Sequence, residues 1–508
     1  MGSQSGSNTG PDLTQGVPVE MLEDGVIIEG RIGKKTVILA KSGDEIFAVG
    51  GVCTHYSGPL SQGIIVGDTV RCPWHHACFS LRTGEALGAP AFDPIACWKV
   101  EHRDGRVFVT EKAEPAPART VQRPDRPERI VIIGGGAAGF AAAEMLRRLD
   151  YAGELTVLSS DADAPYDRPN LSKDYLSGAA SEDWIPLRSP EFYVKNNIDL
   201  RLETTVSRID GDARTVLAVD GQLFPFDRLL LATGAEPVRL AIPGAEKPHV
   251  FILRSLADSR AIIERAKTAK TAVVVGAGFI GLEVAGALRT RGVDVHVVAP
   301  GALPLQRVLG PELGELVRTL HERHGVTFHL NDKATSIGEK DVTLQSGGVL
   351  AADLVVVGIG VKPRTALARD AGINVVQGVL VDDHLETSIP GIFAAGDVAE
   401  WPDATTGELR RIEHWVVAER QGQTAAFNML GARRRFTDVP FFWSAHYETT
   451  INYVGHAAKW DAVDIDGDIA AADAVVRYKQ GGRVVAAATL GRDREALEAE
   501  VAMEADRA

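Results

Sequence analysis

Two glycine-rich segments constrain the possible fold more than any other feature of this sequence. Each follows a short run of β-branched residues and leads into a helical pattern rich in alanine or leucine. A strand, a Gly-x-Gly-x-x-Gly turn and a helix in this order are typical of the βαβ unit whose helix N-terminus binds a dinucleotide pyrophosphate. Two copies in this context predict two Rossmann-like α/β dinucleotide-binding domains. Their glycines are Gly134, Gly136 and Gly139 in the first copy and Gly276, Gly278 and Gly281 in the second.

Length and charge narrow the class of protein. The chain has 508 residues, more than one hydrophobic core usually serves, so several domains are expected. Its formal net charge of −14 argues against nucleic acid as a partner and favours partners with a basic docking patch. No apolar run has the length of a membrane span, and the first residues lack the cationic and apolar regions of a secretory signal. We therefore expect a cytoplasmic protein with no membrane span.

The four cysteines all lie near the start of the chain, and two of them alternate with histidines in Cys53-Thr-His55 and Cys72-Pro-Trp-His75. A Rieske centre needs two thiolates on one iron and two imidazoles on the other, and this spacing lets each loop supply one ligand to each iron. Zinc accepts the same ligand types, but structural zinc sites usually keep their cysteines together and their histidines together. The sequence predicts a [2Fe–2S] cluster held by Cys53, His55, Cys72 and His75, with zinc as the alternative.

Three further motifs carry a family resemblance. They are Pro165-Tyr-Asp-Arg168-Pro-Asn-Leu-Ser-Lys173, Leu231-Ala-Thr233-Gly234 and Ala395-Gly396-Asp397-Val398. From Arg129 onward the chain resembles the pyridine-nucleotide:ferredoxin reductase family of glutathione-reductase-type flavoproteins. With its Rieske motif, nearly the whole chain is similar to the Rieske-containing apoptosis-inducing-factor-like reductases.

The resemblance implies FAD and NADH or NADPH as cofactors. Ser160 or Asp161 is expected at the FAD ribose, where family members usually place an acidic residue. Lys173 and Glu283 are expected to pair beside the flavin, with a purely structural salt bridge as the alternative. Trp415 resembles the aromatic residue beside the flavin, with a core or interface role as the alternative. The other residues that the resemblance assigns to FAD are Gly134, Gly136, Gly139, Arg168, Thr233, Gly234, Gly396 and Asp397, and those assigned to NAD(P) are Gly276, Gly278, Gly281 and Glu283.

The choice between NADH and NADPH stays open in the sequence. An acidic residue at the end of the second strand of the NAD(P) unit would favour NADH, and a nearby arginine would favour NADPH. The chain has Val297-Val298-Ala299-Pro300 there, which provides neither. The family resemblance favours NADH.

The resulting domain organisation has four folded parts. It comprises a small all-β Rieske domain, two Rossmann-like domains of which the first is discontinuous, and an α+β C-terminal domain. The segment between the Rieske domain and the first Rossmann-like domain is rich in proline and charge, which is typical of a semi-rigid linker. The expected ranges are 15–112 for the Rieske domain, 113–127 for the linker, 128–247 and 376–410 for the FAD domain, 248–375 for the NAD(P) domain and 411–508 for the C-terminal domain.

The cofactor set predicts electron transfer. Because no cysteine follows Cys97, dithiol chemistry at the flavin is excluded, and no 2-His-1-carboxylate group indicates a terminal oxygenase. We expect electrons to pass from NAD(P)H through FAD to the Rieske cluster and on to an external acceptor protein such as an oxygenase or a cytochrome. The alternatives are an NAD(P)H-responsive redox signalling protein and a reductase that acts on a small molecule directly at the flavin. Monomer and homodimer are both compatible with the family.

Four smaller expectations concern residues near these motifs. Gly58 and Trp74 stand where high-potential Rieske proteins carry a disulfide, so a low-potential cluster is expected. Cys78 and Cys97 are expected to be buried as small apolar side chains. His76 is expected to be structural rather than a ligand. The segment His321-Glu-Arg-His324 is expected to form a solvated helix face, because its histidines are one residue too close for a metalloprotease pair.

Overall fold

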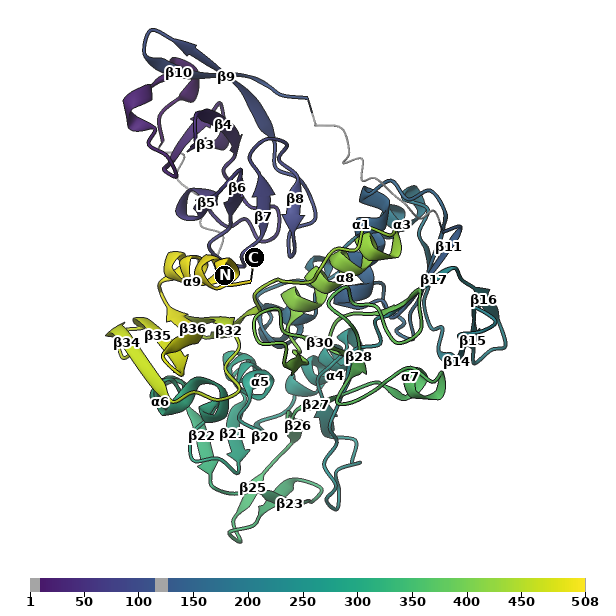
Figure 1. Ribbon diagram of the computed structural model, residues 1–508. Coiled ribbons are helices and arrows are strands. Elements are labelled where there is room, and N and C mark those ends of the chain that lie inside the picture. The colour runs from purple at the N-terminus through teal and green to yellow at the C-terminus, as the bar shows by residue number, and fades with distance from the viewer. Residues whose placement is uncertain (1–9, 115–126, 508) are drawn as a thin grey trace.

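The computed structural model describes residues 10–114 and 127–507, and it has the expected multidomain architecture (Figure 1). Most of the expected linker, 115–126, lies outside the described residues. A β-rich N-terminal part is followed by two parallel-sheet units and an antiparallel sheet with a helix. Among the described residues, no helix combines the length and apolar character needed to cross a membrane.

The N-terminal part consists of two antiparallel sheets. The larger one has six strands in the order β1-β10-β9-β4-β3-β2, and the smaller one has four in the order β5-β6-β7-β8. The two loops that carry the Cys-His motifs leave the ends of β4 and β6, so both loops reach the same end of this part. The strands of the larger sheet are Val17–Pro18, Arg106–Lys112, Cys97–Arg103, Glu45–Gly50, Lys35–Ser42 and Ile27–Ile32 in that order, and those of the smaller sheet are Ile64–Val66, Thr69–Arg71, Cys78–Ser80 and Ala86–Gly88.

The first dinucleotide unit is a parallel sheet with the strand order β13-β12-β11-β17-β29. Its edge strand β29 (Ile392–Ala394) arrives only after the whole second unit, which makes the sheet discontinuous in sequence. The other strands are β11 (Arg129–Ile133), β12 (Glu154–Leu158), β13 (Asp199–Arg201) and β17 (Arg228–Leu231).

The first glycine turn joins β11 to α1 (Ala137–Arg148). Gly134 has φ +112°, a conformation that other residues rarely adopt. A Cβ atom on Gly139 would lie 1.8 Å from the Gly134 carbonyl oxygen, so only glycine allows the helix to approach the strand this closely. The glycine spacing therefore follows from backbone sterics as well as from ligand binding.

The second dinucleotide unit is a parallel sheet with the order β19-β26-β20-β21-β22. Its turn repeats the first, since Gly276 has φ +114° and a Cβ atom on Gly281 would lie 2.2 Å from the Gly276 carbonyl oxygen. Its strands are β19 (Val250–Ile252), β20 (Thr271–Val275), β21 (Asp294–Ala299), β22 (Val326–Leu330) and β26 (Leu354–Val357), and its helices include α5 (Phe279–Thr290) and α6 (Gln306–Arg323).

The C-terminal part is a five-stranded antiparallel sheet with the order β32-β33-β36-β35-β34, followed by helix α9 (Asp493–Ala505). Helix α8 (Trp415–Met429), which falls inside the expected C-terminal range, packs against α1 of the first dinucleotide unit instead. The strands are β32 (Phe441–His446), β33 (Thr449–Gly455), β34 (Ala462–Asp468), β35 (Asp473–Gln480) and β36 (Arg483–Leu490).

A buried carboxylate joins the N-terminal β domain to the rest of the molecule, where α9 lies directly below the smaller sheet (Figure 1). Glu500 of α9 is fully buried and contacts Arg420 of α8 at 2.8 Å and Nδ1 of His76 at 2.8 Å. Arg71 lies 3.5 Å from the same carboxylate and also pairs with Glu504 at 2.7 Å. Burial opposes ionisation, but His76 and Arg420 hold the pKa of Glu500 well below its ordinary value. As expected, His76 has a structural contact outside the Cys-His set.

We expect the substitution Glu500→Gln to destabilise the docked molecule by about 3 kcal/mol or more, because it leaves buried Arg420 without its charged partner. The urea midpoint followed by tryptophan fluorescence measures this loss. Because the pKa of Glu500 is lowered on folding, its stabilisation is present above the unfolded pKa of about 4.3 and is lost as the pH falls further. The difference between parent and variant should therefore shrink below about pH 4.

The matched control is Glu504→Gln, on the next turn of the same helix. Its side chain is partly exposed and pairs with Arg71 alone among the cations of this cluster, so a loss of about 1 kcal/mol or less is expected. Equal losses for the two variants would contradict the role assigned to the buried carboxylate.

Candidate functional site

The structure brings the four Cys-His side chains together at one end of the N-terminal domain. Cys53 and Cys72 are buried, and a hydrogen bond with the Cys72 thiol lowers the pKa of Cys53. Nδ1 of His55 lies 3.2 Å from Nδ1 of His75. Burial lowers the pKa of His55 to about 3 and that of His75 well below its ordinary value, so both imidazoles are neutral, as metal ligands must be.

The pairing of these side chains bears on the kind of metal centre. Among the residues that the structure describes, three or more possible ligand atoms come within 4.8 Å of one another at Asp382, Asp383 and His384 alone. The Cys-His side chains instead form a thiol pair and an imidazole pair. Two pairs suit the two irons of a [2Fe–2S] cluster better than the single tetrahedral ion of a zinc site.

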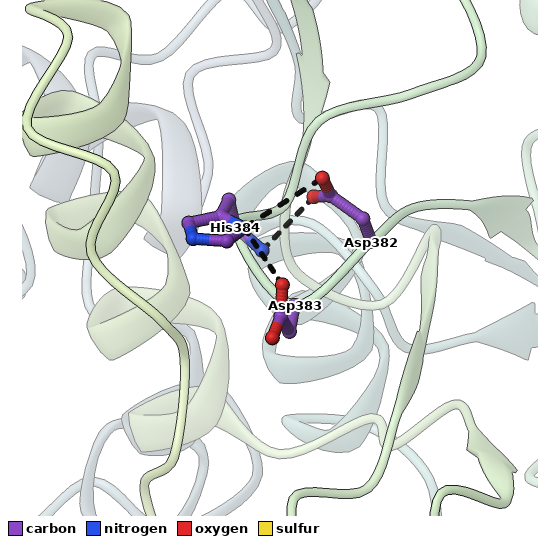
Figure 2. Close-up of side chains that lie close together, drawn as sticks. All are labelled: Asp382, Asp383 and His384. Carbon is purple, nitrogen blue, oxygen red and sulfur yellow. Dashed lines mark hydrogen bonds and ion pairs between the residues drawn. The ribbon is translucent and has the colours of Figure 1, made fainter.

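The acidic group at Asp382, Asp383 and His384 has a structural explanation (Figure 2). Nδ1 of His384 lies 2.7 Å from Asp383 and 3.7 Å from Asp382. Asp382 accepts the backbone N–H groups of His384 and Glu386, and Asp383 pairs with Arg435 at 2.7 Å. Turn formation and ion pairing therefore account for these side chains.

The two Cys-His loops approach each other at Gly58. A Cβ atom on this residue would lie 2.7 Å from Cys72 Sγ and 3.3 Å from the Trp74 ring. Gly58 and Trp74 thus lie next to each other, at the positions where the resemblance puts a disulfide in high-potential relatives. Glycine is needed here because any side chain would push the loops apart.

Residues expected at the flavin converge on the first glycine turn. The Arg168 guanidinium lies 3.4 Å from the position of a Cβ atom on Gly136 and 5.9 Å from the centre of the Trp415 ring. Asp397 pairs with Arg254 at 2.6 Å, an arginine that no motif in the sequence indicates. Gly234 faces Arg254 as well, and Thr233 donates a hydrogen bond to the Arg364 carbonyl.

The polar groups around this turn fit a large polar ligand such as FAD. Buried atoms without a hydrogen-bond partner come from several segments, and they include Asp167 Oδ2, Arg168 Nε, His414 Nδ1, Glu419 Oε2 and Gln421 Nε2. Burial raises the pKa of Asp167 to about 7 and lowers that of Arg168 to about 10. Buried polar atoms in folded proteins are normally paired, so this concentration indicates a ligand-binding site.

The two ribose candidates differ in their surroundings. Ser160 is exposed, whereas Asp161 is half-buried and accepts a hydrogen bond from the Tyr166 hydroxyl at 2.7 Å. At the second glycine turn, the Cβ direction of Gly278 is open, which leaves room for a dinucleotide against the N-terminus of α5.

Lys173 and Glu283 pair as expected. Lys173 Nζ donates to Glu283 Oε2 at 2.8 Å, and Ser172 Oγ donates to the same oxygen at 2.5 Å. The other oxygen, Oε1, accepts a hydrogen bond from Ser444 Oγ at 2.6 Å. The pair therefore connects the first dinucleotide unit, helix α5 of the second unit and the C-terminal sheet.

Strand β32 connects this pair to the Cys-His site. Trp443 packs against His75 with ring centroids 4.1 Å apart, while the next residue, Ser444, bonds to Glu283. Successive side chains of a strand point to opposite faces, so β32 contacts one site with each face. Burial lowers the pKa of His75, and its electrostatic interactions with His55, His76 and Lys173 lower it further. No sequence motif indicates the Trp443–His75 contact or the Ser444–Glu283 contact.

Two expectations about other residues were wrong. In the segment His321-Glu-Arg-His324, the last three residues are exposed as expected, but His321 is fully buried. Helix α6 packs His321 against β32, where its Nε2 lies 3.1 Å from Nδ1 of His446. Cys78 and Cys97 are half-buried rather than buried, since both lie at the ends of strands.

Comparison with known proteins agrees with this geometry. Residues 17–99 match the Rieske [2Fe-2S] domain, and residues 441–508 match the reductase C-terminal domain. Residues 128–422, more than half of the chain, match the pyridine nucleotide-disulphide oxidoreductase family. These families bring FAD, NAD(P) and a [2Fe–2S] cluster as cofactors.

Similar proteins cover the whole length or the reductase portion. Apoptosis-inducing factor 3 of Homo sapiens is 33% identical over 94% of this chain and 81% of its own length. The ferredoxin–NAD(+) reductase component of the anthranilate 1,2-dioxygenase system of Burkholderia cepacia is 37% identical over 72% of this chain and 91% of its own. The putidaredoxin reductase in a covalent complex with putidaredoxin superimposes with a TM-score of 0.72 and 32% identity, covering 74% of this chain and 93% of that one. The chain is thus an NAD(P)H-dependent flavoprotein reductase with a Rieske domain, and it belongs to the pyridine nucleotide-disulphide oxidoreductase family.

Proposed function

We propose that this protein passes electrons from NADH through FAD to its own Rieske cluster, and from there to an external acceptor protein. When bound, the flavin accepts a hydride and gives up electrons singly, and the cluster takes one electron at a time. Cys53, His55, Cys72 and His75 would hold the cluster. The other residues assigned to FAD and NAD(P) above would hold the dinucleotides. The NADH preference rests on relatives named as NAD(+) reductases.

The observation that carries this proposal is the position of β32 between the two sites. Trp443 covers His75, and Ser444 fixes the Glu283 carboxylate that pairs with Lys173. Because these two residues are adjacent in one strand, the cluster and the Lys173–Glu283 pair would keep a fixed separation. A fixed, short separation replaces the diffusional encounter that a separate electron carrier would need.

The chain's own residues have defined tasks in this scheme. Lys173 and Glu283, held by Ser172 and Ser444, would orient the nicotinamide and place a positive charge beside the flavin. Trp415 and Arg168 would line the flavin pocket. Arg254 and Asp397 would contact its polar side chain.

The face of the cluster that would meet an acceptor is the His55 side. His75 is buried under Trp443, whereas His55 is half-buried and stacks on Tyr56 with ring centroids 4.0 Å apart. The neighbouring Val52 side chain is 43% exposed. Electrons would therefore enter at His75 and leave at His55. A ferredoxin-type protein, an oxygenase or a cytochrome is the class of acceptor that these relatives support.

An anaerobic NADH titration tests the proposal. Flavin bleaching together with a rhombic Rieske EPR spectrum of average g below 2 is expected for the parent chain. The variant Cys53→Ser should bleach its flavin but show no such spectrum, and it should lose the reduction of an acceptor protein such as cytochrome c. Cys97→Ser is the matched control, because this thiol lies outside the Cys-His set. Bleaching without cluster reduction in the parent would favour direct reduction of a small molecule at the flavin.

The role of Trp443 has its own test. We expect Trp443→Leu to slow cluster reduction after flavin reduction by about ten- to a hundredfold, because positioning errors of about 1 Å have effects of this size. Rapid-mixing absorbance followed by freeze-quench EPR measures the two steps separately. Trp460→Leu is the control, because Trp460 packs on Tyr478 of β35 in the same C-terminal sheet. This variant should reduce its cluster at the parent rate. An unaltered rate in Trp443→Leu would contradict entry at His75.

A further inference from the structure

A chain of buried polar side chains leads away from the Lys173–Glu283 pair. Ser444 Oγ donates to Glu283 Oε1 at 2.6 Å and lies 3.2 Å from Nε2 of His446. Nδ1 of His446 lies 3.1 Å from Nε2 of His321. The contacts run from α5 through β32 to α6, so each link depends on the packing of a different element.

These side chains are buried far beyond what their polarity favours. Glu283 is 6% exposed, His446 is 2% exposed and His321 is 0% exposed. Burial lowers the pKa of both histidines to about 3, so both rings are neutral at ordinary pH. A neutral imidazole has one nitrogen that donates and one that accepts, and it can therefore take up a proton at one nitrogen while releasing one from the other.

The far end of this series of side chains, at His321, lies close to the surface. Nδ1 of His321 is buried without a hydrogen-bond partner, and so is the hydroxyl of Tyr447, whose ring centre is 5.1 Å away. The Tyr447 ring stacks on His324 at 3.6 Å. The His324 side chain is 37% exposed and lies 3.5 Å from exposed Glu448. Two unpartnered polar atoms next to a surface histidine and carboxylate mark a place where water can complete the chain.

We propose that Glu283, Ser444, His446 and His321 form a proton path from the Lys173–Glu283 pair to the surface at His324 and Glu448. The inference rests on the proposed function and adds to it the fate of the proton. Each NADH that loses a hydride becomes NAD+, and two one-electron acceptors take the two electrons of that hydride. One proton then remains near the flavin, and it must reach solvent before the next cycle.

The transfer balances along the four side chains. When Glu283 takes up a proton, it becomes the donor in its contact with Ser444 Oγ, and the Ser444 hydroxyl turns toward Nε2 of His446. The Glu283 proton then passes to Ser444 Oγ as the hydroxyl proton moves to Nε2 of His446. The proton on Nδ1 of His446 then moves to Nε2 of His321, and the proton on Nδ1 of His321 leaves to water. Each group ends with the number of protons that it had at the start.

A second histidine pair supplies a matched control. Nδ1 of His296 on β21 lies 3.1 Å from Nε2 of His329 on β22, the same spacing as in the proposed path. No hydrogen bond joins this pair to Glu283 in the described part of the chain. Substitution of His296 therefore tests the loss of a histidine–histidine contact that has no connection to the Lys173–Glu283 pair.

The test measures proton release directly. NADH-reduced holoprotein is mixed with ferricyanide in weakly buffered solution, and a pH-indicator dye records protons while absorbance records the flavin. Ferricyanide takes electrons one at a time from the flavin, so the result does not depend on transfer to an acceptor protein. Ser444→Ala and His446→Leu should each slow proton release by about tenfold or more, and His296→Leu should release protons at the parent rate.

Nitrogen NMR of 15N-histidine-labelled protein gives a readout independent of turnover. In the oxidised parent, His321 and His446 should each show one protonated and one unprotonated ring nitrogen from pH 5 to 8. An imidazolium at either position would overturn the path, and so would proton release at the parent rate in both Ser444→Ala and His446→Leu. Ser444→Ala removes one oxygen atom only, so it keeps the test valid where the larger substitution disturbs folding. A parent flavin that NADH does not reduce would instead contradict the proposed function.

Discussion

The arrangement of the molecule depends on one buried carboxylate. Glu500 accepts contacts from His76 of the Rieske domain and from Arg420 of α8, so a single side chain holds three parts of the chain together. A buried charge is tolerated only with well-placed partners, and this requirement fixes geometry more strictly than apolar packing does. His75 immediately precedes His76 in the sequence, so the same docking that satisfies Glu500 places His75 against Trp443. The position of His75 relative to β32 thus follows from an electrostatic constraint.

Strand β32 turns this docking into a connection between sites. One face of the strand contacts His75, and the other face contacts the Lys173–Glu283 pair and lies beside the buried histidines. Electrons and protons would therefore leave the flavin region along opposite faces of one strand. This separation suits a site where a two-electron donor is coupled to one-electron carriers, because the electrons and the proton of the hydride would leave by different routes.

The sequence predicted the parts of the site that depend on local backbone geometry. The glycine spacing at Gly134 and Gly276 follows from the steric demands of one turn, and the Cys-His spacing follows from the ligand needs of two loops. Lys173 and Glu283 could be paired only through the family resemblance, because 110 positions separate them. Trp443, Ser444 and the burial of His321 were beyond prediction, since they depend on which surface α6 and β32 present to other domains. For His321, the charged neighbours in His-Glu-Arg-His favoured a solvated helix, and tertiary packing overrode that local pattern.

The contact between His76 and Glu500 spans 424 positions of the chain. Because synthesis proceeds from the N-terminus, the Rieske domain is complete long before β32 and α9 leave the ribosome. A nascent chain that holds the Rieske domain but not yet β32 therefore lacks the Trp443 ring that covers His75 in the complete structure.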